Sequence, residues 1–174
     1  ATYVEVLTAN PRRKVLKLTL VDGFAGGGQY TRGGIVVPGS PLIVLDELAA
    51  VEARVNAERT KPIHIDSEFI FVERKKPNVE FLAATVKASP HASLVGNRLS
   101  VIHDSFENAL PGIIAHIKSR GRADRAIFFL DQYGYSDVSL QTIRTILEQL
   151  ANPEIILTFN VDWLINYLST EESF

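Results

Sequence analysis

Short apolar stretches alternate along the chain with segments whose apolar residues recur at helical spacing. The stretch from Val15 to Val21 is β-branched and apolar, as expected of a buried strand, and four later stretches share this character. The predicted strands are Val15–Val21, Glu68–Val72, Leu99–His103, Ala126–Leu130 and Glu154–Val161. Amphipathic helical segments separate them, which indicates a doubly wound, mainly parallel α/β sheet.

Caps and prolines indicate where the helices begin and end. Ser40-Pro41 combines a hydroxyl N-cap with a proline at the first helical position, and Ser139 is predicted to cap a helix that Asn152-Pro153 ends. The predicted helices are Ser40 to Arg59, one opened by Pro77, Glu107 to Arg120, one capped by Ser139, and one beginning at Asp162.

Two segments outside this alternation are less regular. Ala1 to Leu7 alternates weakly, which fits an edge strand or the end of a longer N-terminal region. Gln29 to Gly39 contains the breakers Gly33-Gly34 and Pro38-Gly39, and we expect a loop there. Such a loop is expected to displace the helix at Ser40 from the strand before it.

The first strand runs into an acid and a glycine-rich turn, Asp22-Gly23-Phe24-Ala25-Gly26-Gly27-Gly28. Open α/β sheets form nucleotide crevices at such turns, because glycine allows positive φ and close approach of the backbone to a ligand. The spacing Asp22-x-Phe24-x-Gly26-x-Gly28 resembles the first motif of S-adenosylmethionine-dependent methyltransferases, especially those that modify exocyclic amino groups of bases. A turn that only packs a helix on the sheet is the alternative.

Acids follow four successive predicted strands, at Asp22, Glu73, Asp104 and Asp131. Because parallel strands present the same end to one side, all four carboxylates are expected at one edge of the sheet. A carboxylate after the second strand can accept both hydroxyls of a ribose, and one after the third can accept from an adenine amino group. Helix capping could explain any single acid, but four in order favour a nucleotide site.

Two common nucleotide-binding motifs are absent from the sequence, which disfavours dinucleotide cofactors and a phosphate-binding loop. Gly26-Gly27-Gly28-Gln29-Tyr30-Thr31 does not have the final small residue of a dinucleotide fingerprint, and the sequence contains no Gly-Lys-Ser/Thr of a phosphate-binding loop. After the fourth strand, Asp131 and Tyr133 have offsets similar to the acid and stacking aromatic of amino-methyltransferases that extrude a base. Gln132 stands where those enzymes have proline, and a Tyr133 that folds back on the sheet is the alternative.

Composition adds limits on the function. Apolar residues make up 46% of the 174 residues and charged ones 22%, with a net charge of −2, which indicates a globular protein without a global basic field for nucleic acid. Because the chain has zero Cys and its histidines are scattered, we expect no metal site. No apolar run is long enough for a membrane span, so we expect a cytoplasmic protein. The absence of Met suggests a piece of a longer chain, and we expect one methyltransferase-like domain over residues 1–174.

Several blocks together resemble the three-Cys-motif partner proteins, which are bacterial proteins with a methyltransferase-like domain. The blocks are Val21 to Gly26, Gly39 to Ile43, Phe71 to Glu73, Phe128 to Tyr135 and Leu157 to Trp163. The resemblance covers nearly the whole chain from Val15 onward. It implies a Rossmann-like class I methyltransferase fold and a three-cysteine, radical-enzyme-like protein as the partner. Residues after Val161 are too few for the closing β-hairpin of that fold.

Two functions therefore stand as hypotheses. In the first, the chain is an S-adenosylmethionine-dependent methyltransferase with an amino group, such as that of a nucleic-acid base, as acceptor. The assigned residues are Asp22, Phe24, Gly26 and Gly28 for the methionine pocket, Glu73 for the ribose, Asp104 for the adenine, and Asp131 and Tyr133 for positioning the nucleophile. In the second, the chain is a catalytically silent, methyltransferase-like protein that binds the three-cysteine partner.

Overall fold

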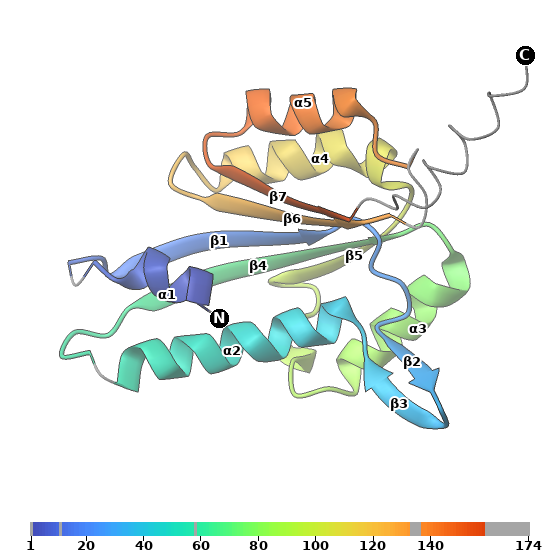
Figure 1. Cartoon of the computed structure of the whole chain (residues 1–174), viewed down its shortest axis with the longest axis horizontal. Coiled ribbons are helices and arrows are strands. Elements are labelled where there is room, and N and C mark those ends of the chain that lie inside the picture. The colour runs from blue at the N-terminus through green and yellow to red at the C-terminus, as the bar shows by residue number, and fades with distance from the viewer. Residues whose placement is uncertain (1, 11, 58, 133–136, 159–174) are drawn as a thin grey trace, which may run out of the picture.

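The computed structural model describes residues 2–10, 12–57, 59–132 and 137–158 (Figure 1). A five-stranded sheet carries helices on both faces, and a two-stranded hairpin lies beside one of its ends. The strands are β1 (Val15–Asp22), β2 (Gln29–Arg32), β3 (Ile35–Pro38), β4 (His64–Glu73), β5 (Leu99–His103), β6 (Arg125–Asp131) and β7 (Pro153–Thr158). The helices are α1 (Thr2–Thr8), α2 (Ser40–Ala57), α3 (Lys76–Lys87), α4 (Phe106–Ser119) and α5 (Leu140–Gln149), with a 3-10 turn η1 (Ala92–Leu94).

The main sheet has the strand order β5-β4-β1-β6-β7, and every neighbouring pair is parallel. Counted along the chain, these strands stand in the order third, second, first, fourth and fifth, which is the strand order of the Rossmann fold. In Figure 1, α2 and α3 lie on one face of this sheet, and α4 and α5 lie on the other. The predicted fold class, a doubly wound and mainly parallel α/β sheet of Rossmann-like type, is confirmed.

Burial on both faces explains why the strands are almost continuously apolar. Leu18 and Leu20 pack with Leu45 of α2 in one buried cluster. Side chains that point to the other face of the sheet, such as Val21 and Phe128, belong to a second cluster that includes residues of α4 and α5. The two clusters hold the helices against the sheet and fix the positions of the strand ends.

The segment between the glycine turn and α2 is a hairpin, not the loop that the breakers predict. Strands β2 and β3 pair antiparallel, and the turn between them is Gly33-Gly34, with φ angles of 58° and 80°. Positive φ at both central residues is what a tight hairpin turn requires, and glycine provides it without strain. The turn signal was therefore correct, but the strands on either side of it were missed.

The hairpin does not displace α2 from β1, in contrast to the expectation from sequence. The Gly39 backbone N–H donates to the Gly28 carbonyl oxygen at 2.7 Å, which brings the two ends of the insertion together. The Ser40 hydroxyl at the start of α2 then donates to Asp22 Oδ2 at 2.5 Å. The chain thus leaves the glycine turn, forms the hairpin, and returns to begin α2 at the end of β1.

One element near the N-terminus and one strand boundary also differ from the prediction. Residues near the N-terminus form α1, because Val4 and Leu7 pack one helical turn apart on the first buried cluster and the Thr8 hydroxyl bonds to the Val4 carbonyl oxygen. Strand β4 begins at His64 and not at Glu68 as predicted. Its first half contains polar residues, so the apolar pattern in the sequence shows only its second half. The predicted helix at Asp162, and the region after Val161 that concerns the closing hairpin, lie outside the described residues.

Candidate functional site

A cleft of about 460 Å³ lies at the carboxyl edge of the main sheet. The strand order reverses between β1 and β6, and ligands of open α/β sheets bind in the crevice at such a point. The cleft is lined from the ends of β1, β4, β5 and β6, by residues that include Gly23, Phe24, Glu73, Asn78, Asp104, Phe106, Asp131 and Asp137. The strands therefore bring three of the four predicted acids, and Phe24, to one site.

Glu73 connects the second strand end to the glycine turn. Its Oε2 atom accepts from the Gly26 backbone N–H at 3.0 Å, and its Oε1 atom accepts from the Lys75 backbone N–H at 2.7 Å. Gly26 has a φ of 60°, a conformation that favours glycine. An ionised carboxylate has about four acceptor positions, so these two bonds orient Glu73 and leave it able to accept from a ligand.

Asp104 bonds to residues at the start of α4 and also lines the cleft. Its Oδ1 atom accepts from the Ser105 backbone N–H at 2.7 Å and from Asn108 Nδ2 at 3.0 Å, at the start of α4. Ser105 is the N-cap of that helix, and its hydroxyl accepts from the Asn108 backbone N–H. The Asp104 carboxylate therefore supports the start of α4 and lines the cleft at the same time.

Asp22 lies beneath the cleft and is not part of its lining. Its side chain is 3% exposed, with Oδ1 accepting from the Phe24 backbone N–H at 3.0 Å and Oδ2 from the Ser40 hydroxyl. Burial raises the pKa of Asp22, the two hydrogen bonds oppose this, and the nearby Asp131 and Glu73 charges add to it. Asp22 thus joins the glycine turn to α2 and belongs to the same electrostatic cluster as the cleft acids.

The fourth strand ends with one exposed and one buried side chain. Asp131 is exposed and lines the cleft, whereas Gln132 is 4% exposed and its Oε1 atom accepts from the Val138 backbone N–H at 3.0 Å. Asp137, next to Val138, lines the cleft as well. The candidate Tyr133 lies outside the described residues.

Gly28 serves packing at the base of the hairpin. A Cβ atom added at Gly28 would lie 2.7 Å from Leu82 Cδ1 of α3, and the Gly28 φ angle is 78°. The contacts of Gly28 are thus with α3 and Gly39, while Gly26 touches the cleft acid Glu73 through its backbone N–H. Of the two glycines predicted for the cofactor, the structure brings one to the cleft residues.

The prediction from sequence missed several residues of the lining. Phe106 lies with its ring centroid 6.2 Å from that of Phe24, so two aromatic rings meet at the cleft. Asn78 and Glu107 enter from the first turns of α3 and α4, and Asp137 enters from the segment before α5. Their positions in first helical turns after strand ends could have indicated Asn78 and Glu107, because helix starts lie at the same edge as strand ends.

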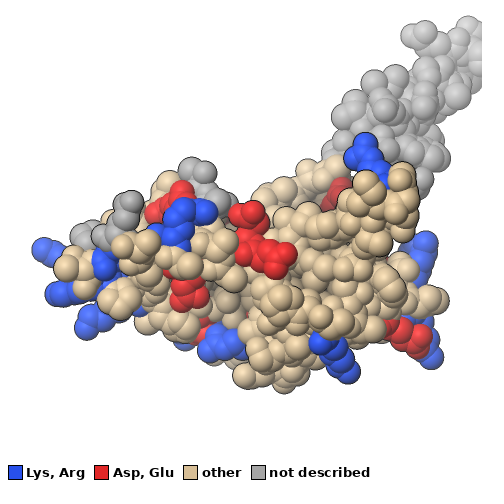
Figure 2. All heavy atoms as spheres, turned by 90° about the horizontal axis from the view of Figure 1, so that it is seen from below, with Lys and Arg blue, Asp and Glu red and all other residues tan. Residues whose placement is uncertain are grey.

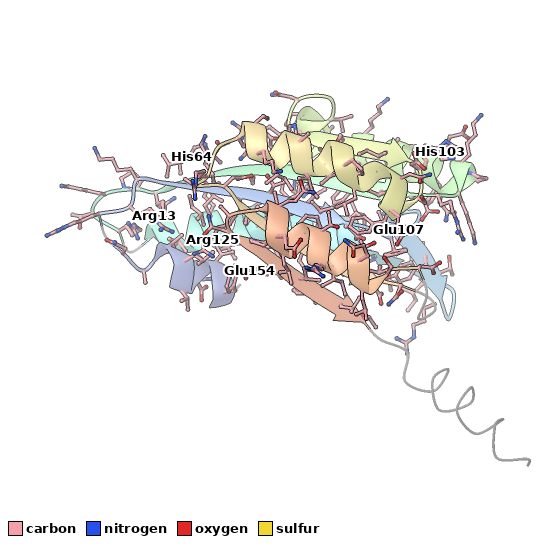
Figure 3. All side chains as sticks on the ribbon, turned by 90° about the horizontal axis from the view of Figure 1, so that it is seen from above. Arg13, His64, His103, Glu107, Arg125 and Glu154 are labelled. Carbon is pink, nitrogen blue, oxygen red and sulfur yellow. The ribbon has the colours of Figure 1, made fainter. Side chains whose placement is uncertain are left out.

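Carboxylates dominate the charge of the cleft. Five acidic residues line it against two basic ones, Arg74 and Lys75; the acids are Glu73, Asp104, Glu107, Asp131 and Asp137. Glu107 accepts from the Thr142 hydroxyl at 2.8 Å, and this bond and those to Ser139 hold the pKa of Glu107 below its ordinary value. Figure 3 shows Glu107 near the end where the strands finish, while Arg13 and His64 lie at the opposite end. The cleft therefore favours a ligand that carries positive charge.

Over the described part of the chain, no group of three or more His, Asp or Glu side chains is arranged to hold a metal ion. None of the described helices has the length and apolar character needed to cross a membrane.

The fold and cleft define an α/β protein of Rossmann-like type with an acidic crevice at the switch point of its sheet. No family model and no curated protein matches the sequence. Among solved structures, the chain is similar to protein LPL1258 from Legionella pneumophila strain Philadelphia 1, which is described by the family model DUF519. The TM-score is 0.56 with 13% sequence identity, over 95% of this chain and 69% of that chain. At this identity the likeness concerns the fold alone.

Proposed function

We propose that this chain is an S-adenosylmethionine-dependent methyltransferase whose acceptor is an amino group, with the amine of a nucleic-acid base as one candidate. The observation that carries the proposal is the meeting of Glu73, Asp104 and Asp131 in one cleft, each from the end of a different parallel strand. The proposal includes a cytoplasmic location, which fits a chain with zero Cys.

Charge and size support this cofactor over other nucleotides. S-adenosylmethionine supplies a methyl group on a positively charged sulfonium, which suits a cleft with five carboxylates and two basic residues. The same carboxylates would repel the pyrophosphate of a dinucleotide. The volume of about 460 Å³ is within the range of roughly 300–1,000 Å³ typical of small-molecule sites.

The cleft residues have chemistry that matches the parts of the cofactor. In this proposal Glu73 accepts from the ribose hydroxyls, since its bonds to Gly26 and Lys75 fix its orientation and leave acceptor capacity. Asp104 accepts from the adenine amino group, and Phe24 provides an apolar surface beside it. Asp131 accepts a hydrogen bond from the acceptor amine and orients it, which is the main contribution that methyl transfer needs from the protein.

Calorimetric titration with S-adenosylmethionine tests this proposal. We expect the wild-type chain to bind it and Glu73→Gln to bind about tenfold more weakly, because a hydrogen bond to a charged acceptor contributes about 1.5–3 kcal/mol. Glu148→Gln, an exposed change on α5, is the matched control and is expected to bind as the wild type does. A folded wild-type chain that does not bind, or a Glu73→Gln variant that matches the control, would contradict the proposal.

We propose as a second candidate that the chain is a catalytically silent, methyltransferase-like protein that binds a three-Cys-motif protein. The observation that favours it is the exposure of large apolar side chains on the β2–β3 hairpin, at Tyr30 (59%), Ile35 (69%) and Val36 (62%). Exposed apolar groups gathered on one element are typical of protein contacts. Co-elution with such a three-cysteine protein, lost in Ile35→Asp, would support this candidate, and equal elution of the variant would contradict it.

A further inference from the structure

Gln132, the residue directly after β6, forms a buried hydrogen bond with Val138. Gln132 is 4% exposed, and its Oε1 atom accepts from the Val138 backbone N–H at 3.0 Å, a bond between two buried residues. A buried amide oxygen with this partner is costly to remove, because the N–H would lose its acceptor in a site away from water. The bond therefore fixes the distance between Gln132 and Val138.

Each of the two bonded residues is preceded in sequence by an acid that lines the cleft. Asp131 precedes Gln132, Asp137 precedes Val138, and both line the cleft. Val138 packs with Phe128, Leu130 and Ile146 in the second buried cluster, so the bond is anchored in the core. Each exposed acid is thus covalently next to a residue that cannot move without disturbing that core.

A second contact holds the same part of the cleft lining from α4. Glu107 Oε1 accepts from the Ser139 backbone N–H at 3.3 Å and from the Thr142 hydroxyl at 2.8 Å. The start of α5 is therefore held against the start of α4, where Glu107 lines the cleft. Hydrogen bonds thus hold this part of the cleft lining at Gln132 and at Ser139. In sequence, Gln132 lies between the two acids, Asp131 and Asp137.

We infer that Gln132 is a positioning residue that holds Asp131 and Asp137 at a fixed separation, so that the two carboxylates together receive the amine that is to be methylated. The inference rests on the proposed methyltransferase function and adds to it a second carboxylate and the residue that spaces the pair. Two carboxylates at a set distance can accept two hydrogen bonds from one amino group, which orients its lone pair.

The test compares two analogues of the cofactor. Sinefungin carries an amine where the cofactor carries its methyl sulfonium, so its amine probes the carboxylates on the acceptor side, and S-adenosylhomocysteine lacks this amine. We expect wild type to prefer sinefungin. In Gln132→Met, which removes the acceptor oxygen at nearly constant volume, we expect that preference to fall about tenfold while S-adenosylhomocysteine binds as before. Gln132→Glu keeps an acceptor oxygen and is expected to retain the preference.

Further variants keep the test decisive. Gln141→Met, an exposed change on α5, is the matched control. Asp137→Asn changes an exposed side chain, so its folding is not at risk, and it too is expected to lower the preference for sinefungin. Hydrogen exchange at the Val138 amide reports whether the Gln132 bond is lost.

The outcomes separate this inference from the proposed function. If the wild type binds neither analogue, the proposed function fails. If both analogues bind but Gln132→Met or Asp137→Asn keeps the wild-type preference, the positioning role is wrong. It is also wrong if both affinities fall in parallel in Gln132→Met, because that result indicates a general structural effect.

Discussion

Asp22 shows how one residue of a motif can support a site without entering it. Its carboxylate receives hydrogen bonds from the Phe24 backbone N–H and the Ser40 hydroxyl and so joins β1, the glycine turn and α2. Sequence spacing predicted an acid at the end of the first strand, and Asp22 is the last residue of β1. It could not show that the side chain points into the core, because the hairpin that returns Ser40 to this position was not recognised.

The raised pKa of Asp22 predicts a pH dependence of stability. Burial is the main cause, so the folded state disfavours the charged form relative to the unfolded state. The ionised carboxylate therefore destabilises the fold, and this loss develops as the pH rises from the ordinary value of 3.8 through the higher folded pKa. We expect the free energy of unfolding of Asp22→Asn, relative to wild type, to increase from about pH 4 to about pH 7. Urea denaturation across this range measures it, and a difference that is constant or decreases would be inconsistent with this account.

Gly28 and Gly34 provide a matched pair that separates packing from backbone conformation. Their φ angles are 78° and 80°, but an added Cβ meets Leu82 at 2.7 Å in the first case and nothing within 4 Å in the second. We expect Gly34→Ala to lose about 1–2 kcal/mol from the left-handed conformation alone. Gly28→Ala should lose about 1–3 kcal/mol more, because Leu82 is fully buried. Equal losses in chemical denaturation would show that the contact with α3 is unimportant.

At the scale of elements, periodicity and caps predicted most of the fold. The strands at Val15 and Leu99 and the cap at Ser139 occur as the sequence suggests, because each depends on local pattern or local hydrogen bonds. The hairpin and α1 were missed, since short elements with exposed or mixed side chains have weak periodicity. Their structure depends on distant contacts such as Gly39 with Gly28, which no local pattern reveals.

The far end of the sheet is held by an ion cluster around Arg120 at the end of α4. The Arg120 side chain is 9% exposed, lies within 3.2 Å of Asp124 Oδ2, pairs with Glu68, and donates to the Asp66 carbonyl oxygen. The Thr19 hydroxyl of β1 donates to the same Asp124 atom at 2.6 Å. The cluster thus joins α4, β4, β1 and the segment before β6 at the edge opposite the cleft.

Removing the Arg120 guanidinium from this cluster should strongly destabilise the protein. Arg120→Met is expected to lower the free energy of unfolding by about 3–5 kcal/mol, because it leaves the buried Asp124 carboxylate without its charged partner. Arg122→Met, an exposed change nearby, is the control and is expected to change stability by less than about 0.5 kcal/mol. The two values come from denaturant titration, and similar losses in both variants would mean that the cluster contributes little.

Across the whole molecule, the parallel sheet brings the acids that follow its strands to one edge. Figure 2 shows Lys and Arg side chains at both ends of the molecule. The acids of the cleft lie at the end where the strands finish. Because all strands of the main sheet run in one direction, residues that follow strands in sequence gather in space. This is why the edge of the site could be predicted from sequence, while Asp137, which lies in the segment before α5 and not at a strand end, could not be given its place.

The proposed function requires the cofactor to lie in this cleft, and an amide-resolved NMR titration with S-adenosylmethionine tests this most directly. We expect the shifts to concentrate at the strand ends, in the amides of Gly26, Lys75 and Ser105, whose N–H groups bond to Glu73 and Asp104. Shifts that concentrate instead around His91 and Thr85, in the separate cleft between α2 and α3, would contradict it. So would an absence of shifts at saturating cofactor.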